Sequence, residues 1–79
     1  MADCVLRDET GRVVTVASRD LTLRWLKQEC PDGEYSIEGP GIDMTFYRIK
    51  GVVYPSGGTF DGEKMPPRSR EECVDAFGP

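Results

Sequence analysis

The side chains that could carry chemistry in this chain are carboxylates and thiols, since it has 14 Asp and Glu residues, 3 Cys and no His. Histidine is the residue that most often transfers protons near neutral pH. Its absence also excludes Ser-His and Cys-His nucleophile pairs. Pairs of carboxylates carry little information where carboxylates are this common. We therefore predict that the chain is not an enzyme.

The cysteines do not have the spacing of a metal site or of a disulfide framework. Cys4, Cys30 and Cys73 are far apart in sequence, and their number is odd. We expect reduced, structural thiols and no bound metal. The glycine clusters at 39–41 and 56–58 lack the Lys and Ser/Thr of a phosphate-binding loop, so we expect turns there and no cofactor.

The acidic residues are concentrated in one part of the chain. The net charge is −4, yet residues 28–47 hold five acidic side chains and no basic one. The net charge of this window is therefore −5, while the net charge is +1 for residues 1–27 and zero for residues 48–79. The acidic residues of the window are Glu29, Asp32, Glu34, Glu38 and Asp43.

Two strands are predicted inside this window, at 34–38 and 42–50, because apolar and polar residues alternate there. If they form an antiparallel hairpin, the outward residues pair as Glu38 with Asp43, Ser36 with Thr45, and Glu34 with Tyr47. Like charges directly opposite each other cost up to about 1 kcal/mol. A sequence selected only for stability would tend to avoid the first pair.

Two interpretations of this hairpin face remain open. Outward acidic residues can serve solubility alone. Alternatively, the face binds a protein with a basic surface, because successive outward positions on one strand face are about 6–7 Å apart, close to the phosphate spacing of a nucleic-acid strand. The predicted partner-binding residues are Asp32, Glu34, Glu38, Asp43 and Tyr47.

The rest of the sequence predicts a single α+β domain over residues 1–79, in the order ββαββ(β)α, with an antiparallel sheet of four to five strands and two helices. Residues 19–30 are the ambiguous segment, because Leu21 and Trp25 fit an alternating strand as well as a helix. The cap at Ser18 favours the helix. The other predicted elements are strands at 3–7, 12–17, 52–54 and 59–61, a turn at 55–58 and a loop at 62–68. A second helix is predicted at 70–77. Ser69 and Glu72 form a capping box at its start, and Gly78-Pro79 ends it.

No signal peptide and no apolar run of the about 20 residues that span a bilayer are found in the sequence. We expect a cytoplasmic protein with no membrane contact, as a monomer or weak dimer. Direct nucleic-acid binding is not expected, because the chain is acidic and carries no recognised motif.

In its length, acidity, α+β pattern and lack of catalytic motifs, the chain resembles the small anti-CRISPR proteins of bacterial viruses. The acidic run from Glu29 to Asp43 is similar to surfaces that some of them use. The resemblance is to inhibitors of type I CRISPR surveillance complexes. It implies a stoichiometric inhibitor in the bacterial host cell that covers a basic nucleic-acid-binding groove. The alternative is a small phage or bacterial structural or assembly protein that self-associates or docks through apolar surface.

Overall fold

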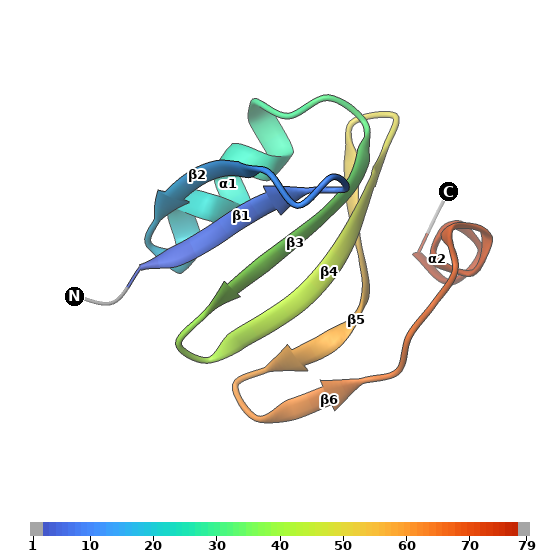
Figure 1. Ribbon diagram of the computed structural model, residues 1–79. Coiled ribbons are helices and arrows are strands. Elements are labelled where there is room, and N and C mark those ends of the chain that lie inside the picture. The colour runs from blue at the N-terminus through green and yellow to red at the C-terminus, as the bar shows by residue number, and fades with distance from the viewer. Residues whose placement is uncertain (1–2, 78–79) are drawn as a thin grey trace.

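A computed structural model describes residues 3–77, with Phe77 described by its backbone only. The fold is a small α+β domain built on one antiparallel sheet of six strands, in the order β2-β1-β3-β4-β5-β6 (Figure 1). Within this range the elements are β1 (Cys4–Asp8), β2 (Val13–Ala17), α1 (Arg19–Gln28), β3 (Gly33–Gly39), β4 (Ile42–Ile49), β5 (Val52–Phe60), β6 (Glu63–Met65) and α2 (Arg70–Phe77).

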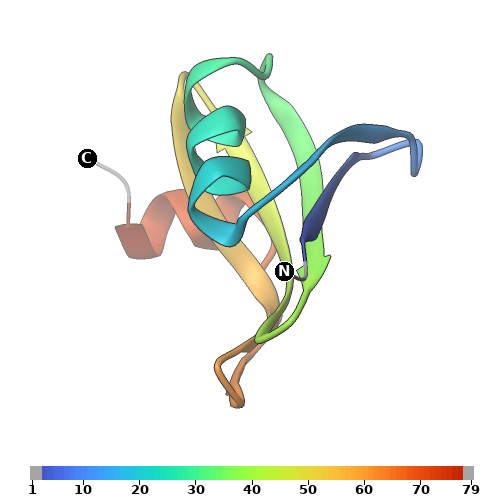
Figure 2. The ribbon, with the colours of Figure 1, turned by 90° about the vertical axis from the view of Figure 1, so that its left-hand side faces the viewer.

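The two helices lie against different parts of the sheet. Helix α1 contacts β1, β2, β4 and β5, and α2 contacts β5. Strands β4 and β5 run between the helices, as Figures 1 and 2 show from two directions. The main core lies under α1, where Leu6, Leu26 and Ile37 are fully buried. Helix α2 lies on the opposite face of the sheet, against β5.

Helix α1 confirms the helical interpretation of its segment. The hydroxyl of Ser18 accepts a hydrogen bond from the backbone N–H of Leu21 at 3.3 Å, so the predicted N-cap is present. The helix ends at Gln28, two residues earlier than predicted. Thr22 is fully buried, which the sequence did not indicate, and its hydroxyl is satisfied by the carbonyl of Arg19 at 2.8 Å.

Helix α2 begins at the predicted capping box. The Ser69 hydroxyl accepts from the N–H of Glu72, and the Glu72 carboxylate accepts from the N–H of Ser69, both at 3.2 Å. The helix docks through Cys73, which is fully buried. The predicted stop at Gly78-Pro79 lies outside the described residues.

The predicted turn at 55–58 is wrong. These residues continue β5 through a bulge, which leaves Ser56 as the extra residue between the pairs Thr45–Gly57 and Phe46–Pro55. The next position but one, residue 58, must be glycine, because the Cβ of any other residue there would collide with the backbone carbonyl of Asp43. Glycines in this segment therefore permit close strand contact and do not end the strand.

Strand β6 was missed, because residues 62–68 were expected to be a loop. The signal for it was Asp61-Gly62, a dipeptide that favours two-residue hairpins. Both residues have positive φ, of 50° and 85°, and Phe60 pairs with Glu63 across the turn. The sheet consequently has six strands, against the four to five expected.

The sheet joins two sets of sequence neighbours. Strands β1 and β2 form one hairpin, and β3 to β6 follow one another as a meander. Within residues 3–77 the two sets pair only through the ladder between β1 and β3, in which Val5 pairs with Glu38 and Arg7 with Ser36. The connection between the two sets runs through α1, so this ladder is formed by residues distant in sequence.

Candidate protein-binding face

The β3–β4 hairpin has the predicted register. Glu38 pairs with Asp43, Ser36 with Thr45, and Glu34 with Tyr47. The intervening residues Tyr35, Ile37, Met44 and Phe46 are buried in the core. The strand alternation therefore sends the polar residues of both strands to the face opposite α1.

Three carboxylates of this hairpin project into solvent. The side chains of Glu34, Glu38 and Asp43 are exposed. Among the described residues none of them makes a hydrogen bond or an ion pair. Glu38 and Asp43 occupy directly opposite positions, where Cβ atoms lie about 4.5–5.5 Å apart. Two like charges thus face each other, and neither is part of an ion pair among the described residues.

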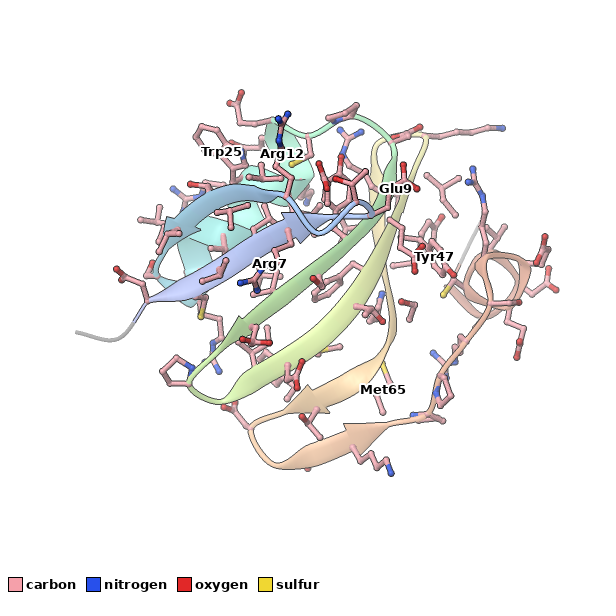
Figure 3. All side chains as sticks on the ribbon, viewed as in Figure 1. Arg7, Glu9, Arg12, Trp25, Tyr47 and Met65 are labelled. Atoms are coloured by element: carbon pink, nitrogen blue, oxygen red, sulfur yellow. The ribbon has the colours of Figure 1, made fainter. Side chains whose placement is uncertain are left out.

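Two further acidic residues, Glu9 and Glu71, lie near these three, which the sequence did not indicate. Glu9, in the β1–β2 turn, lines a shallow depression of about 200 Å³ together with Glu34. Figure 3 shows Glu9 at the tip of that turn. Glu71 of α2 raises the pKa of Tyr47, as Glu34 does, while Arg70 beside Glu71 lowers it. We call Glu9, Glu34, Glu38, Asp43 and Glu71 the acidic face.

Tyr47 lies on this face but is less open than predicted. Its side chain is half-buried at the junction with α2, toward which it points in Figure 3. Burial is the main reason that its pKa is raised, and the charges of Glu34, Cys73 and Glu71 raise the pKa further. Tyr47 therefore leaves part of its side chain exposed, with Glu34, Glu71 and Arg70 near it.

Basic residues border the acidic face and limit its charge. Arg7 of β1 pairs with Ser36, which sets it diagonal to Glu34 and Glu38, about 7–8 Å away. Figure 3 shows Arg7 on this side of the sheet. Lys64 of β6 pairs with Thr59, the neighbour of Asp43. The negative charge is consequently strongest along β3 and β4 and decreases toward both edges.

Asp32 does not belong to the acidic face, although it was predicted with it. Its carboxylate is bound at the end of the sheet, where it accepts hydrogen bonds from the N–H groups of Lys50 at 2.7 Å and Gly51 at 3.1 Å. It also pairs with Arg48 at 2.6 Å. These two backbone hydrogen bonds, followed by the charge of Arg48, hold the pKa of Asp32 below its usual value. Asp32 therefore stabilises the β4–β5 turn.

Glu29 is likewise not part of the acidic face. It is the C-cap residue of α1 and lines a groove beside β2, on the side of the sheet that carries α1. Of the five acidic residues in the window, only Glu34, Glu38 and Asp43 share one surface.

The three cysteines are buried and form no disulfide. Burial raises the pKa of the Cys30 and Cys73 thiols, which disfavours their reactive thiolate forms. Within residues 3–77 no three His, Cys, Asp or Glu side chains gather in a group that could hold a metal ion. No helix in this range has the length and apolar character to cross a membrane.

Comparison with protein-family models, curated protein sequences and solved structures found no match to this chain.

Proposed function

We propose that this chain is a non-enzymatic inhibitor that binds a basic, nucleic-acid-binding groove of another protein through its acidic face. The observation that carries the proposal is the cross-strand pair of Glu38 and Asp43, two exposed carboxylates that face each other and form no ion pair among the described residues. Such a pair is unfavourable in the free protein and becomes favourable when cations of a partner lie against it. Following the resemblance to anti-CRISPR proteins, the groove is that of a type I CRISPR surveillance complex.

The neighbourhood of this pair supports the same proposal. Glu9 and Glu34 extend the carboxylates along the hairpin, and Tyr47 adds an aromatic ring of the kind that contributes strongly at interfaces. Attraction between exposed charges is screened by salt, so binding is expected to weaken as ionic strength rises.

The test is inhibition of DNA binding by a purified type I surveillance complex. Charge reversal of Glu34, Glu38 and Asp43 to lysine is expected to weaken inhibition by about 100-fold or more, because a basic groove would then repel the face. A matched control reverses three exposed acidic residues away from this face, Asp20, Glu29 and Glu63, with the same change in net charge. Full inhibition by the first variant would exclude the acidic face, and no inhibition by the unaltered chain would exclude this target.

The alternative function, a structural or assembly component, is favoured by one specific observation. Leu21 and Trp25 of α1 are large apolar side chains with about half of their surface exposed. An apolar docking surface of this kind predicts association that resists salt. Complexes that persist unchanged at high salt would support this alternative over the acidic face.

A further inference from the structure

The two edges of the sheet differ in how they discourage pairing with another strand. The β6 edge has only three residues, includes Glu63 and Lys64, and is followed by Pro66-Pro67. Short length, charge and proline all oppose the addition of a strand. The β2 edge has five residues, Val-Val-Thr-Val-Ala, with neither charge nor proline. Of the two edges, β2 is therefore the one open to a further strand.

The β2 strand also presents apolar side chains. Val13 is 49% exposed and Val16 is 52% exposed. Both are β-branched residues, which favour extended pairing. The strand carries one bulge, at Val14, but an uncharged and apolar edge of this length is the kind that natural proteins normally pair or cover.

Helix α1 adds a second apolar element beside this edge. Its inner side is closed against the sheet by Thr22 and Leu26, while Leu21 and Trp25 are 50% and 44% exposed. These two side chains and β2 border a groove of about 280 Å³. Figure 3 shows Trp25 at the β2 side of the molecule. Thr15 and Ala17 supply the β2 side of this groove, so the strand edge and the groove form one region. Val13 and Val16 pair with Arg7 and Val5 and lie at the same edge on the opposite face of the sheet.

We propose that a second copy of this chain occupies this region, with its β2 strand paired antiparallel to the first. A two-fold axis normal to the sheet relates strands paired in this way and keeps both α1 helices on the same side. Backbone pairing and contact between the two Leu21–Trp25 surfaces then occur together. A single symmetric contact covers both exposed elements.

The charges of the groove fit a two-fold partner. The groove is lined by one basic residue, Arg24, and one acidic residue, Glu29, which lie on different turns of α1. Because the axis reverses the helix direction, Arg24 of one copy is directed toward the Glu29 end of the other. The residues that line the groove therefore carry no net charge, and two copies can meet there without net repulsion.

The resulting interface is small, so we expect a weak dimer that depends on concentration. Sedimentation velocity from low micromolar to near-millimolar concentration measures its formation. Trp25 is the single tryptophan of the chain and lies in the interface, so its emission reports dimerisation directly. We expect a shift toward dimer and a blue shift of tryptophan emission as concentration rises.

The decisive variant replaces Val13 and Val16 with lysine, which places like charges along both paired strands. It is expected to raise the dimer dissociation constant by about 10-fold or more. The matched control is Val52→Lys with Val74→Lys, which adds the same charge at exposed valines away from β2. Leu21→Gln tests the helix half without altering the sheet and is expected to weaken the dimer as well.

Three results would overturn this proposal. They are a strict monomer over the whole concentration range, a dimer unaffected by the β2 lysines and by Leu21→Gln, and equal weakening by the control. The reversal of Glu34, Glu38 and Asp43 is expected to leave the dimer intact, which separates this interface from the acidic face.

Discussion

Asp32 and Glu34 are separated by one glycine, yet they lie in two acidic regions with different roles. The Asp32 carboxylate has three hydrogen-bonding partners at the end of the sheet, and Glu34 has none among the described residues. The first region holds the fold together. The second leaves its carboxylates exposed to solvent. Acidic charge in this window therefore serves stability at the open end of the hairpin and, as we propose, recognition from Glu34 to the pair of Glu38 and Asp43 beside the turn.

The role of Asp32 follows from the turn that it contacts. Lys50 and Gly51 form a two-residue β-hairpin loop, with φ of 52° and 79°. Glycine tolerates positive φ, but lysine adopts it at a cost. Asp32 accepts the N–H groups of both residues and so stabilises this backbone conformation. Through Arg48, which also donates to the carbonyl of Lys27 at 3.2 Å, the same site contacts the last turn of α1.

The largest expected effect on stability is that of Asp32→Ala. It removes the partner of Arg48 and of two backbone N–H groups, so we expect a marked fall in Tm, larger than for alanine at Glu34, Glu38 or Asp43. Thermal unfolding followed by circular dichroism measures it. Lys50→Gly in the Asp32→Ala background is expected to restore part of the loss, because glycine relieves the turn. If Asp32→Ala matched Glu34→Ala in Tm, the distinction between the regions would be lost.

Acid titration tests the stabilising role of Asp32 in a second way. The pKa values of Asp32 and Asp8 are lowered in the folded state, chiefly by backbone hydrogen bonds at Asp32 and by the Thr10 hydroxyl at Asp8. Their stabilising contributions are present above the unfolded pKa of about 3.9 and are lost as pH falls through the lower folded values. We expect stability to fall below about pH 4 and Asp32→Asn to flatten this decline. A slope unchanged by Asp32→Asn in urea unfolding at several pH values would contradict the assignment.

The smallest expected effect is a gain in stability. Glu38→Thr removes the repulsion with Asp43 and places a β-branched residue in the strand, so we expect stabilisation of up to about 1 kcal/mol at low salt. The gain should shrink at high salt, where the repulsion is screened. Urea unfolding at two ionic strengths measures both. The same variant is expected to weaken partner binding, and a variant with improved stability and unchanged inhibition would count against the acidic face.

The sequence predicted the acidic hairpin well because its register depends on local features. Strand alternation and the short connection at Gly39-Pro40-Gly41 leave one register that buries Ile37 and Met44 together. The partners of Asp32 could not be predicted in this way. They depend on where the β4–β5 turn lies relative to the end of α1, which is a tertiary contact.

The contributions of Glu9 and Glu71 escaped prediction for the same reason. Glu9 reaches the face through the pairing of β1 with β3, and Glu71 reaches it through the docking of α2 on β5. Neither pairing has a signature in local sequence. Strand β5 was misjudged because glycine and proline usually interrupt strands, whereas here Gly57 lies against Pro67 and Gly58 against Asp43.

The ladder between β1 and β3 also has a consequence for the order of folding. The β3–β6 meander has short turns between neighbouring strands, so its contacts can form early and locally. Pairing Val5 with Glu38 must instead close a long loop that contains β2 and α1. We expect this closure to be the slow step. The acidic face is completed only then, because Glu9 arrives with β1 and the chain cannot present its full charge before the last strand is in place.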